Sequence, residues 1–191
     1  MELVDRAENY HKTFPKWPRL VVDGGFILGT WMIGNNYRSK SGFYGEYPPS
    51  YLKRVMSLFP DADPSKTLHL FSGSLGPDVP GIRFDINPGL APTVVGKAEE
   101  LSNYFPAGSL DLILSDPPYS KEDAAHYGFP LPNVHKVVGE CAKVLRPGGH
   151  LVWLDTRFPM YKKIELKLMM TVGLVRSTNH RVRMVFGWER L

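Results

Sequence analysis

The sequence LDLILSDPPY at residues 110–119 predicts a buried strand that ends in an acid, two prolines and an aromatic ring. Apolar residues dominate 110–115, as in strands that are covered on both faces. Four residues of distinct chemistry follow at once: Asp116, Pro117, Pro118 and Tyr119. Because proline has no backbone N–H to give to a sheet, the strand is expected to end before the prolines. The four residues then lie together at its carboxyl end.

This tetrapeptide favours methylation of a planar exocyclic amine, whose lone pair is spread into the ring and is a poor nucleophile. Acceptors on both amine hydrogens localise the lone pair. Asp116 can supply one as its carboxylate, and the carbonyl of Pro117, held by the fixed φ of two prolines, can supply the other. Tyr119 offers a face for a base extruded from its stack. A Pro-Pro turn with Asp116 as an ordinary cap explains the tetrapeptide alone equally well.

Further elements are predicted around this strand. Strands are expected at residues 67–71, 82–85, 93–95 and 150–154. The first leads into residues 72–76, where glycines let a ligand approach the backbone closely. The second ends in Asp85, whose carboxylate could accept from both hydroxyls of a ribose. A helix with apolar residues at helical spacing is expected over 133–145, between an Asn133 cap and the stop at 147–149.

In this order, the motifs resemble the class I S-adenosylmethionine-dependent methyltransferases, and in particular the amino-methyltransferases with a D/N/S-P-P-Y/F/W motif. The resemblance covers about residues 44–191. It implies an α/β fold with a Rossmann-like, mostly parallel sheet and a C-terminal antiparallel hairpin. It also implies S-adenosyl-L-methionine as the cofactor. Residues 145–149 resemble the segment that leads into the fifth strand of this family.

The resemblance assigns roles to individual residues. Catalytic roles are implied for Asp116, Pro117, Pro118 and Tyr119. Residues 71–74 resemble the glycine loop under the methionine part of the cofactor, Asp85 the ribose ligand, and residues 95–101 the segment that lines the adenine. Residues 44–49, with a helix at 50–59, resemble the F-P-x-x-L segment. Cofactor contacts are therefore implied for Tyr47, Phe71, Ser72, Gly73, Ser74, Asp85, Ile86, Ala98, Glu99 and Asp116.

Two departures from the family pattern matter. The first two crossovers, residues 72–81 and 87–92, contain prolines and are too short for a full helix, so the sheet is expected to be helix-poor there. Another segment must then cover that face, and the N-terminal segment is the predicted one. Lys97 stands where the family often has an aspartate that reads the adenine amine, and a lysine cannot accept that bond. We expect Lys97 to face solvent.

One domain is predicted for residues 1–191, with a catalytic core at 44–191 and an N-terminal extension, 1–43, on or near the active site. Residues 21–28 predict a hairpin with an Asp-Gly-Gly turn. Trp31, Asn35, Asn36, Tyr37 and Arg38 form a mixed aromatic and polar stretch. Packing over the helix-poor face is preferred to base stacking as its role.

Composition narrows the class of protein. Residues 1–12 are too polar for a signal peptide, and no apolar run could cross a bilayer. The lone Cys141 lies on the apolar side of the predicted helix and supports no disulfide framework, so a cytoplasmic protein is expected. His69 alternates with apolar residues and is predicted to lie in the core. No spacing typical of zinc or calcium sites occurs, and we expect no metal.

Basic residues gather near the carboxyl end. Residues 157–191 carry eight Lys/Arg against two acids, and a hairpin is predicted over 174–188 with its turn at 177–180. This is a candidate footprint for phosphates, although a solvated polar face explains it nearly as well. Lys121 and Tyr127 follow the motif, in a predicted loop. Substrate contacts are therefore predicted for Lys121, Tyr127, Arg157, Arg176 and Arg181.

These observations predict methyl transfer to an amine of a nucleic-acid base. Adenine N6 in DNA is preferred, because an aspartate-led motif is typical of adenine enzymes. The alternatives are an RNA base amino-methyltransferase and a non-catalytic cofactor-binding partner subunit; a protein amide methyltransferase is less favoured, since its motif begins with asparagine. No separate target-recognition domain is evident. Relaxed specificity, the N-terminal segment, a homodimer or a partner subunit are the options left open.

Overall fold

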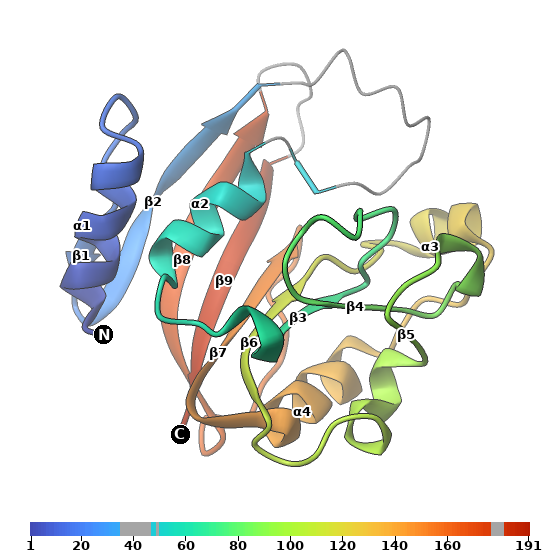
Figure 1. Cartoon of the computed structure of the whole chain (residues 1–191). Helices are drawn as coiled ribbons and strands as arrows, with labels where there is room; N and C mark the ends of the chain where they lie inside the picture. The colour runs from blue at the N-terminus through green and yellow to red at the C-terminus, as the bar shows by residue number, and fades with distance from the viewer. Residues whose placement is uncertain (35–46, 49, 177–181) are drawn as a thin grey trace.

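The computed structural model describes residues 1–34, 47–48, 50–176 and 182–191, and within these ranges nine strands form a single sheet. The sheet has the order β1-β2-β8-β9-β7-β6-β3-β4-β5 (Figure 1). The strands are β1 (Val21–Asp23), β2 (Phe26–Ile33), β3 (Thr67–Leu70), β4 (Ile82–Asp85), β5 (Val94–Val95), β6 (Leu110–Ser115), β7 (Leu145–Asp155), β8 (Leu166–Arg176) and β9 (Val182–Arg190).

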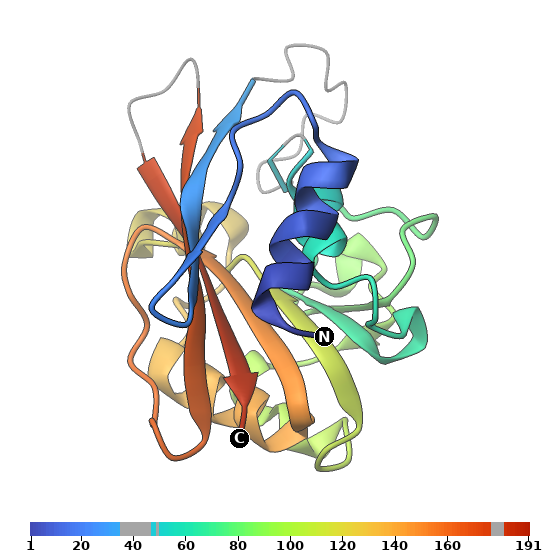
Figure 2. The ribbon, with the colours of Figure 1, turned by 90° about the vertical axis from the view of Figure 1, so that its left-hand side faces the viewer.

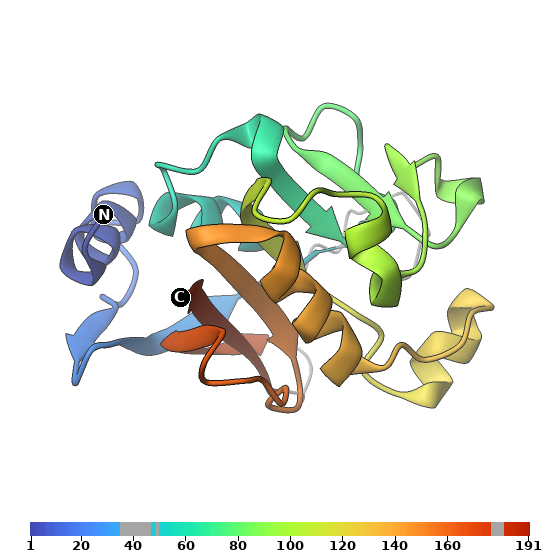
Figure 3. The ribbon, with the colours of Figure 1, turned by 90° about the horizontal axis from the view of Figure 1, so that it is seen from below.

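Helices cover both faces of this sheet. They are α1 (Leu3–Thr13), α2 (Tyr51–Leu58), α3 (Lys121–Tyr127) and α4 (Val134–Val144), with the 3-10 turns η1 (Pro64–Lys66), η2 (Pro88–Leu90) and η3 (Ala98–Asn103). Seen from below, α4 lies on one side of the sheet and α1 on the other (Figure 3). In Figure 2, α1 lies beside α2.

Strand directions confirm the predicted fold class. Five neighbouring pairs are parallel, namely β2–β8, β3–β4, β3–β6, β4–β5 and β6–β7. The carboxyl-terminal strands β8 and β9 form an antiparallel pair, and β9 also runs antiparallel to β7. The predicted turn of this hairpin lies outside the described residues. All six residues of β6 are buried, as its continuous apolar pattern predicts for a central strand.

The first two crossovers are helix-poor, as their prolines predict. In the described chain, no helix occurs between β3 and β4, and only the turn η2 lies between β4 and β5. The helices α1 and α2 cover the sheet over β2, β6, β7, β8 and β9, where Tyr10 and Val55 join Trp31 of β2 in one hydrophobic cluster. Trp31 is thus a packing residue. The remaining aromatic and polar positions of its stretch, 35–38, lie outside the described residues.

The N-terminal segment forms more structure than its sequence indicates. The predicted Asp-Gly-Gly hairpin is present as β1 and β2, with positive φ at Gly24 and Gly25. However, β2 continues to Ile33 and pairs in parallel with β8, which extends the sheet beyond the predicted hairpin. The helix α1 was not predicted, because residues 3–13 are largely polar and only a narrow side, with Ala7 and Tyr10, is buried.

Two other boundaries differ from the prediction. The segment after the motif is a helix, α3, where a loop was predicted, because Ser120 caps it by accepting from the Asp123 N–H at 3.1 Å and Gly128 ends it at φ 76°. Strand β7 begins at Leu145 and not at His150. Leu145 already pairs with Leu110 across an irregularity in register, so Pro147 and the glycines lie within an extended segment.

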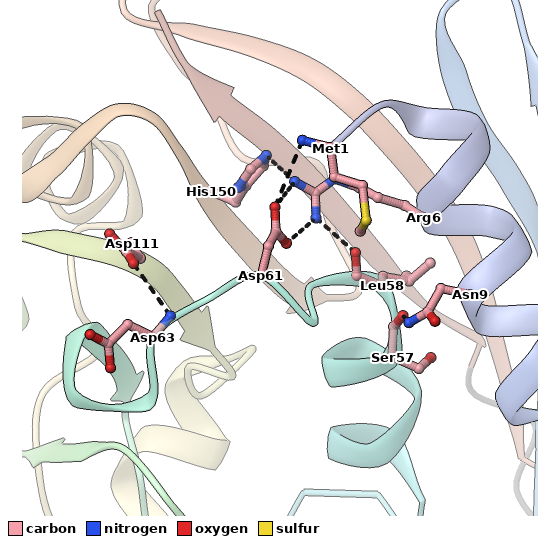
Figure 4. A network of polar contacts seen from close by, with 9 residues as sticks. All are labelled: Met1, Arg6, Asn9, Ser57, Leu58, Asp61, Asp63, Asp111 and His150. Atoms are coloured by element: carbon pink, nitrogen blue, oxygen red, sulfur yellow. Dashed lines mark hydrogen bonds and ion pairs between the residues drawn. The ribbon is translucent and has the colours of Figure 1, made fainter.

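A polar network fastens α1 to the sheet (Figure 4). The guanidinium of Arg6 donates to both carboxylate oxygens of Asp61, at 2.9 and 3.1 Å, and to the Leu58 carbonyl at 2.8 Å. Its Nη2 also lies 3.5 Å from Nε2 of His150 on β7. Burial, and then the charge of Arg6, lower the pKa of His150 to about 4, so this imidazole is neutral at pH 7.

Candidate active site

The DPPY motif and the glycine loop lie side by side at one edge of the sheet. Leu70, the last residue of β3, pairs in parallel with Ser115, the last residue of β6. The chain leaves β3 through Phe71 and Gly73, which adopt positive φ of 59° and 53° and turn the loop sharply. Asp116, the residue after Ser115, therefore lies level with the start of this turn. Two motifs that are far apart in the sequence thus form one site.

Asp85 connects this loop to the end of β4. Its Oδ2 accepts from the Gly73 N–H at 2.9 Å, and its Oδ1 accepts from the Asn87 N–H at 2.9 Å. Each carboxylate oxygen can accept a second hydrogen bond, so both remain able to bind a diol. The aspartate that the sequence singled out thus lies directly against the glycine loop.

A pocket of about 440 Å³ opens between the glycine loop and the start of α2. This volume lies within the range of small-molecule sites in proteins. Its lining comprises Tyr47, Pro48, Ser50, Leu52, Lys53, Ser72, Ser74, Leu75 and Gly76. Within the part of the chain that the structure describes, the hydroxyls of Ser72 and Ser74 are buried without a hydrogen-bond partner. Since unpaired buried hydroxyls are costly, the pair is suited to a polar ligand in this pocket.

Asp116 lies in an unusual electrostatic environment. Burial raises the pKa of its carboxyl to about 6, against the Tyr119 hydrogen bond and the Arg183 charge, which lower it. The nearby carboxylate of Asp155 raises it as well. The Tyr119 hydroxyl donates to Oδ1 of Asp116. A carboxyl with such a pKa is mostly ionised at neutral pH and loses its charge in mild acid.

Two further tyrosines lie close to this carboxyl. Tyr47 stacks on Tyr51 with ring centroids 5.4 Å apart, and its hydroxyl donates to the Leu114 carbonyl of β6 at 3.4 Å. Burial, and then the charge of Asp116, raise the pKa of Tyr47. Because Tyr47 also lines the pocket, it connects the pocket with the motif. Tyr51 is fully buried, and its hydroxyl has no hydrogen-bond partner among the described residues.

Arg183 belongs to the predicted basic hairpin but was not among the substrate contacts assigned from the sequence. Its Nη1 donates to the Tyr119 hydroxyl at 2.9 Å, and its guanidinium carbon lies 5.8 Å from the centre of the Tyr119 ring. It belongs to β9, 64 residues from Tyr119 along the chain. The only available signal was its membership of the basic carboxyl-terminal segment, and that signal did not distinguish it from the other arginines.

The predicted substrate residues fall into different positions. Arg157 donates from Nη2 to the Tyr119 carbonyl at 2.8 Å, and Arg176 lies close enough for the charges of Arg183 and Asp116 to affect its pKa. Lys121 and Tyr127 lie at opposite ends of α3, with Lys121 exposed. Arg181 lies outside the described residues. The structure therefore brings Arg157 and Arg176 to the motif.

The segment expected to line the adenine forms η3. Ala98 is buried and Lys97 is exposed, as predicted for a surface charge. Glu99 accepts from the Asn133 N–H at 2.9 Å, so one of its oxygens fastens the start of α4. Ile86 follows Asp85 and is half-buried.

Two side chains outside the site occupy the places predicted for them. His69 is buried in β3, and its Nε2 lies 3.1 Å from the Pro80 carbonyl. Cys141 is fully buried in α4. Among the described residues, no group of three or more His, Cys, Asp or Glu could hold a metal ion. In the same ranges, no helix has the length and apolar character needed to span a bilayer.

Known proteins resemble the chain in structure only. No family model and no curated protein matches its sequence. TrmN from Thermus thermophilus superposes on 77% of this chain with a TM-score of 0.57 at 20% identity, and this chain covers 50% of TrmN. The chain thus spans about half the length of that protein.

A second solved structure is similar over almost its whole length. An rRNA methylase from Streptococcus thermophilus has a TM-score of 0.50 at 9% identity, with 78% of this chain and 99% of the methylase covered. At such low sequence identities, structural similarity shows the fold alone. The chain therefore has the mixed α/β fold of Rossmann-like methyltransferases.

Proposed function

We propose that this chain is an S-adenosyl-L-methionine-dependent methyltransferase that acts on an exocyclic amine of a nucleic-acid base. The observation that carries the proposal is the position of Asp116 at the carboxyl end of β6. Asp116 directly follows Ser115, which pairs with Leu70 at the start of the glycine loop, and its carboxylate accepts from the Tyr119 hydroxyl. An ionised acceptor held in a largely dehydrated site is what a weakly nucleophilic amine requires.

Residues that line the pocket, together with others outside its lining, fit the proposed cofactor. Ser72 and Ser74 offer two unpaired hydroxyls to the polar methionine end, and Asp85 offers carboxylate oxygens to the ribose. Lys53 lines the same pocket and supplies a positive charge for a carboxylate. Ala98 and Ile86 supply apolar surface near the adenine. When bound, the cofactor supplies an electrophilic methyl group on its sulfonium.

The chain's own residues prepare the amine. Asp116 accepts one amine hydrogen and the Pro117 carbonyl accepts the other, which localises the nitrogen lone pair. The adjacent Pro118 restricts the backbone, so the two acceptors keep their positions during the reaction. The ring of Tyr119 stacks on the face of the base. Arg157 and Arg176, with Lys121, Tyr127 and Arg181, are proposed to contact the nucleic acid around it.

Adenine N6 in DNA remains our preferred target, because the motif begins with aspartate. The rRNA methylase among the similar structures makes an RNA base the second candidate. Transfer of tritium from labelled cofactor to DNA, RNA and protein in parallel separates these cases. Label in none of them, with cofactor still bound, would favour a non-catalytic partner subunit. Intact Asp116 and Tyr119 argue for turnover.

The first prediction concerns cofactor affinity. Asp85→Ala should weaken binding of S-adenosyl-L-methionine by about 1.5–3 kcal/mol, roughly 10- to 150-fold in Kd, because hydrogen bonds to a charged acceptor are lost. Calorimetry measures the change, and Asp85→Asn, which keeps one acceptor oxygen, should lose less. An unchanged affinity in a folded Asp85→Ala protein would show that Asp85, at the end of β4, does not bind the ribose.

The second prediction concerns pH. Since Asp116 has a pKa of about 6 and must be ionised to accept from the amine, kcat/KM should rise as pH increases towards 7 and then level off. Below pH 6 it should fall by about tenfold per pH unit. A profile that stays flat down to pH 5 would contradict this role.

Thermal melts provide the control for this profile. The pKa of Asp116 in the folded protein is above its ordinary value, so protonation favours the folded state at this residue. Its contribution to stability is present in acid and is lost as pH rises through about 6. Activity should therefore decline between pH 7 and 5 without any destabilisation that comes from this carboxyl.

A further inference from the structure

Three side chains form a continuous hydrogen-bonded chain across the site. Arg183 on β9 donates to the Tyr119 hydroxyl at 2.9 Å, and this hydroxyl donates to Oδ1 of Asp116. The phenol oxygen thus accepts one bond and gives one. Nothing in the local sequence of the motif requires the first contact, which joins the carboxyl-terminal hairpin to the end of β6.

This arrangement uses one acceptor site of the carboxylate that the reaction needs. In the structure, Oδ1 of Asp116 is occupied by the phenol of its own motif. Each carboxylate oxygen can accept a second hydrogen bond, so a substrate amine can donate to Asp116 while the phenol hydrogen stays in place. The phenol, held from its other side by Arg183, fixes the orientation of the carboxylate for that amine.

We propose that Arg183 is a positioning residue that holds the Tyr119 hydroxyl on Asp116, so that the carboxylate is oriented towards the target amine and the Tyr119 ring stays beside the base. This inference rests on the proposed function. It assigns to Arg183 a role that acts through Tyr119 and not through direct contact with substrate. The guanidinium suits this task because it binds the oxygen and also lies over the ring face, 5.8 Å from its centre.

The surroundings of Asp116 indicate that the positive charge of Arg183 acts on this carboxyl, in addition to the hydrogen bond that Arg183 makes with Tyr119. The groups that act on this carboxyl electrostatically are Tyr119, Arg183, Arg176, Asp155, Tyr47 and Tyr51. Burial opposes the charge of Arg183, yet Tyr119 and Asp116 keep its pKa above the ordinary value. Arg183 is thus a permanent cation that faces both members of the motif.

A double-mutant cycle tests the proposal. Arg183→Met should lower kcat/KM by at least about tenfold in the wild type but by less than about threefold in the Tyr119→Phe background, because the hydroxyl it acts on is already absent. Arg183→Lys should restore part of the loss. Lys167→Met, an exposed charge removal on β8, controls for the general effect of one cation on nucleic-acid binding.

Additive losses in this cycle would overturn the proposal. If Arg183 instead held a substrate phosphate, its removal would cost the same with or without the hydroxyl. It would also reduce the slope of log KM against log salt by about one, whatever the residue at 119.

A second measurement needs no substrate. The ¹³C signal of the Asp116 carboxyl, identified by its loss in Asp116→Asn, should titrate near pH 6 in the wild-type protein. Arg183→Met should move the midpoint upward by about one pH unit, Tyr119→Phe should also raise it, and Arg183→Lys should change it least. Failure to methylate any nucleic acid would reject the proposed function alone, whereas an unmoved midpoint in Arg183→Met would reject the role of Arg183.

Discussion

Replacement of Asp116 by alanine should abolish methyl transfer while the cofactor still binds. The variant removes the only charged acceptor that the motif offers to the amine, and electrostatic contributions of this kind are commonly worth on the order of 10²–10³ in rate. The cofactor is expected to keep most of its affinity, because Asp85, the glycine loop and the pocket serines are unchanged. Single-turnover transfer of labelled methyl, beside calorimetry of cofactor binding, measures the two effects.

Asp116→Asn is the matched variant for this experiment. It keeps the size and one acceptor oxygen but removes the charge, so it too should lose most activity. Because burial of the ionised carboxyl opposes folding, Asp116→Asn should melt no earlier than wild type above pH 6, and this difference should disappear in acid. Cofactor affinity lost in step with activity would make Asp116 a binding residue and would remove the basis of the proposed mechanism.

Much of this site could be predicted because its signals are local in sequence. Strand β6 is a continuous apolar run, and Pro117 stops it at the position observed. Asp85 ends a short strand, and Asn133 caps α4 through its own side chain, which accepts from the Lys136 N–H at 3.1 Å. Each of these features is determined by a few neighbouring residues, and parallel pairing of the strands then brings the separate motifs to one edge.

The features that could not be predicted depend on contacts between distant residues. In the sequence, Arg183 is one of several basic residues near the carboxyl end, like Arg176 and Arg190. Its contact with Tyr119, far away along the chain, is what distinguishes it. The helix α1 has a polar sequence because its stability comes from tertiary contacts, such as Arg6 with Asp61 and Tyr10 with Arg54. A single sequence contains no periodic pattern for pairs of this kind.

The polar network under α1 leads to the largest expected change in stability. Asp61→Ala should lower the free energy of unfolding by about 3 kcal/mol, or roughly 6–12 °C in melting temperature, because it leaves the buried guanidinium of Arg6 without its counter-charge. Arg6 has a side chain only 2% exposed, whereas Asp61 is 44% exposed. The cost should therefore depend on which partner is removed.

Arg6→Met is the test of this asymmetry. It should cost clearly less than Asp61→Ala, since water can solvate the half-exposed carboxylate and a methionine side chain can fill the space against Phe59. Arg6 holds the pKa of Asp61 below its ordinary value despite partial burial, so the stabilisation is present near neutral pH and is lost as pH falls below about 4. Melts at pH 7 and pH 3 should show the difference between wild type and Asp61→Ala shrinking in acid. Equal costs for the two variants at pH 7 would mean that the network contributes through packing, and not through compensation of a buried charge.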